Sequence, residues 1–151
     1  MSESRLREVL AETATLSLAT VDDDGHPHAA NVNFVADAEL NLLFISDADS
    51  AHAHHVAARP RVAATAYPSF EAPDQIRGVQ LRGECHAVSD DGFDTCWEQF
   101  VAKFPYAAAF EAVARDQRFH RLRPTWLRLI DNRVHFGFKW EMSWPPGHAP
   151  R

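Results

Sequence analysis

The chain has 151 residues, of which 46% are hydrophobic and 24% charged, a balance that excludes a disordered or fibrous protein. At roughly 100–200 residues per domain, this length predicts a single domain spanning residues 1–151. With 15 Lys and Arg against 21 Asp and Glu, the formal charge is −6. A nucleic-acid partner is therefore not expected, because such binders usually present a basic face. No apolar stretch approaches the roughly 20 residues of a membrane span, so no membrane partner is expected either.

The N-terminal residues and the cysteines indicate the compartment. Met1–Arg5 lack the apolar stretch of a signal peptide. Cys85 and Cys96 form neither a CxxC pair nor a metal-type spacing, and nothing in the pattern requires a disulfide between them. Two reduced core thiols are typical of the cytosol, so we expect a cytoplasmic protein.

Hydrophobic periodicity and turn residues define the elements of the first half of the chain. Asp22–Gly25 has the composition of a hairpin turn. The helix predicted at Ala51–Ala58 ends before Pro60, since the residue preceding a proline avoids the helical region. The histidines that flank the turn, His26 and His28, are expected to be exposed. The predicted elements are a helix through Leu6–Leu10, strands at Thr15–Val21, His28–Ala36 and Leu42–Ser46, a helix at Ala51–Ala58 and a strand at Arg61–Tyr67.

The second half contains the clearest strand pattern, Gln75–Val88, whose apolar residues alternate with polar ones. Gly78 would allow a β-bulge there, because the apolar phase changes before it. An apolar stripe at helical spacing predicts a helix over Phe93–Phe104. The remaining predicted elements are a helical segment from Pro105 through Val113 and strands at Thr125–Ile130 and Val134–Trp140, joined by a two-residue turn at Asp131–Asn132.

About seven strands, joined mostly by hairpins, predict a mainly β (α+β) fold. Antiparallel connections with alternating faces favour a small closed barrel with helices packed outside it. A doubly wound α/β sheet is disfavoured, since strands and helices do not alternate regularly. The common Gly-rich phosphate loops are also missing from the sequence.

Nine histidines raise the question of a metal site. His52 and His55 share one face of the predicted helix while His54 points elsewhere. Two ligands are too few for zinc, and spacing does not supply a third, so we expect no metal site. The sequence also has no GxSxG nucleophile elbow.

The strand-to-helix step at Phe44–Ser50 is the stronger chemical signal. A helix N-terminus presents unpaired backbone N–H groups and a partial positive charge, which suit an anion such as phosphate. Histidines one turn later would add donors, and charge when protonated. The alternative is simple capping by Asp49 or Ser50, which requires no ligand.

The order and spacing of these motifs resemble the pyridoxamine 5'-phosphate oxidase-like, flavin-binding split-barrel family. The similarity runs from the N-terminal helix to Trp140. IRGVQLRGE and DNRVHFGFKW look especially like a functionally uncharacterised bacterial branch. The segments that carry the resemblance are TLSLATVDDDGHPHAANVNF, LLFISDADSAHAHHVAARPRVAAT, IRGVQLRGECHAV and WLRLIDNRVHFGF.

The resemblance implies a homodimeric split barrel of six to seven strands, with FMN in a groove between the subunits. Arg82 would lie with Gln80 on a strand face that contacts the dimer partner or the cofactor. Trp126 or Trp140 would provide an apolar surface that packs against the flavin ring. The cofactor-binding residues that the resemblance implies are Asn31, Asn33, Ser46, Asp47, Ser50, His52, His55 and Gln80.

One departure from the family concerns the phosphate. The oxidases have a Ser-Arg-Lys run, whereas this chain has Ser50-Ala51-His52. Two permanent cations are lost, and each charge-assisted hydrogen bond contributes about 1.5–3 kcal/mol. The terminal Gly147–Arg151 segment also lacks the Arg-Leu-x-Pro end that helps the oxidases hold the vitamin B6 phosphate. We therefore do not expect pyridoxamine phosphate oxidase activity itself.

Three functional hypotheses follow. The first is an FMN-dependent oxidoreductase that acts on an unknown small organic substrate. The second is a non-catalytic module that binds flavin, haem or a deazaflavin; haem is included because imidazole is a common axial ligand and the 51–58 segment is rich in histidine. The third is a structural dimer whose groove is empty.

Overall fold

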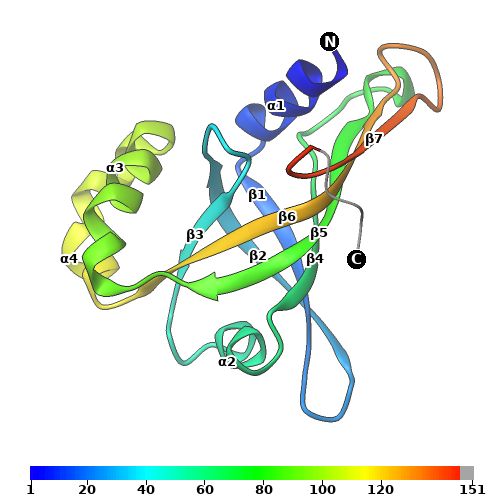
Figure 1. Ribbon diagram of the computed structural model, residues 1–151. Helices are drawn as coiled ribbons and strands as arrows, with labels where there is room; N and C mark the ends of the chain where they lie inside the picture. Colours follow the sequence, from blue (N-terminus) through cyan, green and yellow to red (C-terminus); the bar gives the residue numbers. More distant parts are fainter. Residues whose placement is uncertain (147–151) are drawn as a thin grey trace.

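The computed structural model describes residues 1–146, so residues 147–151 of the predicted domain, and the terminal segment compared with the oxidases, lie outside the described part (Figure 1). The strands are β1 (Thr15–Val21), β2 (Pro27–Ala36), β3 (Leu42–Ser46), β4 (Arg61–Ala66), β5 (Arg77–Ala87), β6 (Arg118–Asp131) and β7 (Lys139–Ser143). The helices are α1 (Ser2–Glu12), α2 (Ala51–Ala58), α3 (Phe93–Lys103) and α4 (Glu111–Arg115), with short 3₁₀ turns η1 (Pro73–Gln75), η2 (Asp90–Gly92) and η3 (Pro105–Phe110). None of the helices within 1–146 is long and apolar enough to cross a membrane.

Closure of the barrel depends on β6. The strand order is β3-β2-β1-β4-β5-β6-β7, and β3 also pairs with β6, so six strands close and β7 is an extra strand. Along one edge of β6, Arg118–Leu122 pair with β3 and Trp126–Ile130 pair with β7, while β5 follows the other edge. All pairings are antiparallel, which confirms the predicted mainly β barrel with peripheral helices.

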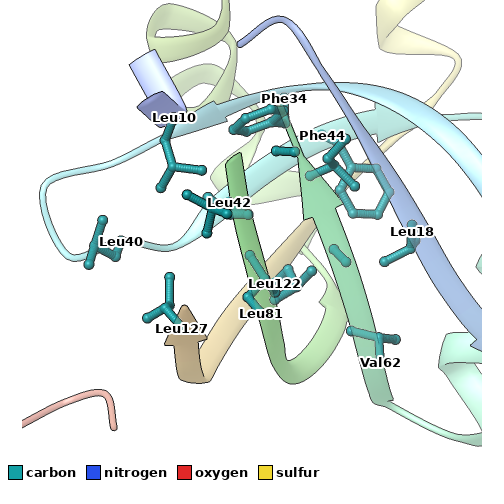
Figure 2. Packing of buried hydrophobic residues seen from close by; sticks show 14 of the residues in the cluster. Leu10, Leu18, Phe34, Leu40, Leu42, Phe44, Val62, Leu81, Leu122 and Leu127 are labelled. Carbon is teal, nitrogen blue, oxygen red and sulfur yellow. The ribbon is translucent and has the colours of Figure 1, made fainter. Parts of the chain in front are cut away.

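The barrel interior is filled by the apolar side of each alternating strand. Leu18, Phe34, Phe44 and Leu122 are completely buried there (Figure 2). The apolar stripe of α1 closes one end of the barrel through residues that include Leu10. Full burial of one such side chain contributes about 1.5–3 kcal/mol, so this interior supplies most of the driving force for folding.

The bounds of β6 and β7 differ most from the prediction, whereas those of β2, β4 and β5 differ by one or two residues. β6 begins at Arg118 rather than Thr125, and β7 is Lys139–Ser143 rather than Val134–Trp140. Pro124 hides the continuity of β6, since a proline normally interrupts a central strand. The predicted two-residue turn is a longer loop, in which the Phe136 side chain is 76% exposed rather than aligned with a core face.

Pro124 is tolerated because it lies at a β-bulge. The register between β5 and β6 shifts at Arg82/Gly83, with Gly83 opposite Pro124, so the bulge is not at Gly78 as predicted. A Cβ atom on Gly83 would collide with the carbonyl of Arg123. The two backbones therefore approach at a distance that only glycine allows.

We expect Gly83→Ala to destabilise the protein by about 1–3 kcal/mol, because the collision is with backbone rather than with a mobile side chain. The measurement is the midpoint of urea unfolding. Gly78→Ala on the same strand is the control, since its Cβ would meet Ala66 O and Tyr67 Cβ at 3.1 Å and needs only a small adjustment. Equal midpoints for the two variants would contradict the close approach at the bulge.

Asp131 anchors the loop after β6. Its side chain is completely buried, and its carboxylate accepts hydrogen bonds from Arg133 Nε and Nη2 at 2.8 Å each. A second guanidinium, from Arg5 on α1, lies 3.7 Å away. The Arg133 hydrogen bonds and charge hold the pKa of Asp131 below its usual value against the opposing effect of burial.

We expect Asp131→Asn to lower the free energy of unfolding at pH 7 by about 1–3 kcal/mol. A depressed carboxyl pKa stabilises the fold above the unfolded pKa of about 4, and this stabilisation is lost as the pH falls through the folded pKa. The difference between wild type and variant should therefore shrink at pH 3. A difference that stays constant from pH 7 to pH 3 would show that the pair does not act through charge.

Candidate functional site

The N-terminus of α2 is built by the turn that follows β3. The carboxylate of Asp47 accepts the Asp49 N–H at 2.8 Å, and its carbonyl accepts the Ser50 N–H at 3.1 Å. Ser50 then caps α2, because its Oγ accepts the Ala53 N–H at 3.3 Å. Of the two predicted caps, Ser50 and not Asp49 is the one observed, and the predicted helix bounds are confirmed. Asp47 therefore stabilises the turn that leads from β3 into α2.

Three polar side chains converge at this helix end. His52 Nε2 lies 2.9 Å from Ser46 Oγ and 3.2 Å from Ser50 Oγ. Partial burial lowers the pKa of His52, and the nearby charges of His28 and His55 lower it further. At neutral pH the site therefore offers two hydroxyls and an uncharged imidazole.

A buried aromatic wall lies behind His52. The Phe44 ring is 6.3 Å from the His52 ring and stacks on the His120 ring at 5.2 Å with an interplanar angle of 7°. His120 is 2% exposed, and its Nδ1 has no hydrogen-bond partner within residues 1–146. Burial lowers the pKa of His120 to about 4, so this imidazole is neutral in the folded protein at pH 7. Sequence reasoning missed His120 because the strand that carries it was predicted to begin only at Thr125, whereas β6 begins at Arg118.

His55 belongs to a second group, which it forms with Thr20 and His28 of the β1–β2 hairpin. Its Nδ1 lies 2.8 Å from Thr20 Oγ1, and its ring meets the His28 ring edge-on at 5.2 Å. His28 is half-buried, which corrects the expectation that it is exposed; the hairpin places it against α2. His26 is exposed as predicted.

The remaining predicted residues lie on the outer face of the barrel. Asn31 Oδ1 accepts from Ser17 Oγ at 2.7 Å, and Asn33 is also exposed on β2. On β5, Gln80 Oε1 accepts from Arg128 at 3.4 Å. Strands β1 and β4 separate β2 from β5, and neighbouring strands are about 4.8 Å apart. The structure therefore brings Ser46, Asp47, Ser50 and His52 together and leaves Asn31, Asn33 and Gln80 outside that cluster.

Asp22, Asp24 and His26 in the β1–β2 turn place their potential ligand atoms within 4.8 Å of one another. Asp22 Oδ1, however, accepts the backbone N–H groups of Asp24 and His26 at 2.9 Å each. This carboxylate therefore organises the hairpin turn, and the group remains on the surface.

The sequence profile described as Pyridoxamine 5'-phosphate oxidase matches residues 2–131. The chain belongs to this family. The match includes the whole barrel up to the end of β6, which confirms the resemblance read from the motifs.

A UPF0306 protein of Klebsiella pneumoniae is 28% identical over 120 residues, covering 79% of this chain and 78% of the relative. The pyridoxine/pyridoxamine 5'-phosphate oxidase of Pseudomonas paraeruginosa is 33% identical over 87 residues, covering 58% of this chain but 39% of that enzyme. The shared segment is thus less than half of the oxidase.

Solved structures of the same fold include haem-binding proteins. One from Mycobacterium smegmatis has a TM-score of 0.77 at 19% identity, covering 95% of this chain and 58% of that one. The haem storage protein HutZ of Vibrio cholerae has a TM-score of 0.67 at 20% identity, covering 82% and 87%. At these identities the likeness establishes the fold alone.

Replacing His120 by Phe tests whether the buried imidazole makes the protein sensitive to acid. The unfolded chain binds a proton near pH 6.5 and the folded chain only near pH 4, so this histidine lowers stability as the pH falls between these values. We expect His120→Phe to reduce the loss of stability between pH 6.5 and pH 4 by up to about 3 kcal/mol. His86→Phe, at an exposed position on β5, is the control. Parallel pH profiles of stability for wild type and His120→Phe would contradict the assignment.

Proposed function

We propose that this protein is an FMN-binding oxidoreductase that acts as a homodimer on a small organic substrate. The observation that supports the proposal is the convergence of Ser46, Ser50 and His52 at the α2 N-terminus, within the family fold. Hydroxyl donors and the first free N–H groups of a helix suit a terminal phosphate. These three residues are among those to which the resemblance assigns contacts with the flavin and its phosphate.

The residues present fit a phosphate, with two weaknesses. Ser46 and Ser50 donate through hydroxyls that can turn towards an oxyanion, and the helix dipole adds partial positive charge. The imidazole of His52 replaces a permanent cation, and burial lowers its pKa. The carboxylates of Asp47 and Asp49 are exposed nearby and oppose a dianion. We therefore expect FMN to bind more weakly than it would at a site with the Arg-Lys pair.

The flavin would supply the redox chemistry, exchanging electrons with the substrate. In the proposed homodimer, Asn31, Asn33 and Gln80 would contact the ring across the subunit boundary, since they lie on the outer face of the barrel. Their amides would donate hydrogen bonds to the ring edge on which charge collects during reduction. His55 positions α2 through its bond to Thr20.

An FMN titration followed by flavin fluorescence tests the phosphate position. We expect His52→Lys to tighten FMN binding by about tenfold, because a permanent cation would restore a charge-assisted bond of about 1.5–3 kcal/mol. His54→Lys adds the same charge two residues away, on a side chain that is 67% exposed, and should change the affinity far less. Unchanged or weaker FMN binding by His52→Lys would count against this placement.

Haem is the second candidate, with a deazaflavin as a further option. Haem-binding proteins from two bacteria share this fold, and α2 carries three histidines. The absorption spectrum of the freshly purified protein separates the candidates. Two bands of a yellow flavoprotein would support FMN, whereas a sharp Soret band would favour haem. A colourless protein that also ignores added FMN would reject the proposed enzyme.

A further inference from the structure

A groove of about 480 Å³ crosses the outer face of the barrel over β1, β4, β5 and β6. Ala19 and Ala63 form its floor, so the sheet is accessible there. A second hollow of about 360 Å³ shares these two alanines, Arg82 and Trp126, and extends the groove to Gln80. The combined groove therefore reaches the strand face that the proposed function assigns to the flavin ring.

The β-bulge positions one arginine at this groove. The register shift directly after Arg82 leaves it opposite Trp126 on β6, and its guanidinium lies 4.4 Å from the centroid of the indole ring. Thr125 Oγ1 donates to the carbonyl of Arg82 at 3.3 Å and fixes the backbone at the same point. Stacking and backbone anchoring pre-organise the guanidinium, so little conformational entropy remains to be lost when it binds a partner.

Two arginines, Arg82 and Arg128, lie next to the Trp126 ring, but within the described residues only Arg128 is paired with a carboxylate. Arg128 lies 5.0 Å from the same ring centroid, but its Nη2 is 2.9 Å from Glu141 and its Nη1 contacts Gln80. Arg82 is exposed and has no carboxylate within 4.0 Å in residues 1–146. One guanidinium on this indole is thus neutralised, while the other is available to an external anion.

The charges around the groove indicate the kind of ligand. Arg61 also borders the groove and, like Arg82, forms no ion pair within the described part of the chain. Glu84 is the single acidic residue of the lining, and it lies 3.6 Å from His86. A planar guanidinium binds a planar carboxylate through two parallel hydrogen bonds. The alanine floor suits the apolar body of a small molecule.

We propose that this groove binds the carboxylate group of a small organic acid, with Arg82 as the anchoring residue. The claim that such an acid is the substrate of the oxidoreductase rests on the proposed function. The claim that the groove binds a carboxylate rests on the groove, the bulge and the unpaired guanidinium, and it can be tested without a flavin.

The test is an NMR titration of the intact protein with benzoate, a planar carboxylate, and with benzamide, its neutral counterpart. We expect benzoate to shift the signals of Ala19, Ala63 and the Trp126 indole, and to bind at least tenfold more tightly than benzamide. Arg82→Gln should weaken benzoate about tenfold or more, and Arg82→Lys should weaken it less, since charge remains but the fork is lost. Lys139→Gln removes one charge from an exposed position on β7 and should leave the affinity within about twofold.

Several results would overturn the proposal. These are no shift with benzoate, equal affinities for benzoate and benzamide, or unchanged benzoate binding by a folded Arg82→Gln protein. Phenyl phosphate that binds tenfold more tightly than benzoate would assign the groove to phosphates instead. Benzoate binding in a protein that takes up no FMN would support the groove and reject the oxidoreductase, so the two proposals fail separately.

Discussion

The pairing of β6 with both β5 and β3 is the constraint on which the structure depends. β6 contacts β5 along one edge, and on the other edge it closes the barrel through β3 before pairing with β7. The closing register sets Ser46 opposite Arg118 and Phe44 opposite His120. It therefore fixes where β3 ends, where α2 begins and which buried ring lies behind His52. The β5–β6 bulge, at the other half of the same strand, aligns Arg82 with Trp126.

The candidate phosphate site combines a helix N-terminus, a common anion-binding element, with two serines and a histidine in place of an Arg-Lys pair. The helix N-terminus and the two serines would contribute neutral hydrogen bonds, which are individually weaker than charge-assisted ones. His52 would contribute charge only when protonated, and its burial disfavours that form. This chemistry accommodates a phosphate without the strong permanent attraction of an Arg-Lys pair. A site of this kind suits a cofactor that exchanges with solution.

Much of the fold could be predicted because the interior-facing residues alternate so regularly. β1, β3 and α2 were predicted with their observed bounds, since the alternation of Thr15–Val21 and the Ser50 cap are local signals. The start of β6 was missed because it depends on a bulge that matches Pro124 with Gly83, residues far apart in sequence. For the same reason the sequence identified His52 and Ser50 but missed the wall behind them. The stacking of Arg82 on Trp126 is likewise a product of register, which no local pattern reveals.

The central claim is that the N-terminus of α2 holds the phosphate of FMN. The most direct measurement is a joint NMR titration that follows the ³¹P signal of FMN and the backbone amide signals of the protein. The account predicts that the ³¹P line shifts on binding and that the largest amide shifts fall at Ala51, His52 and Ala53. A ³¹P line that keeps its free position, or amide shifts confined to other parts of the barrel, would contradict it.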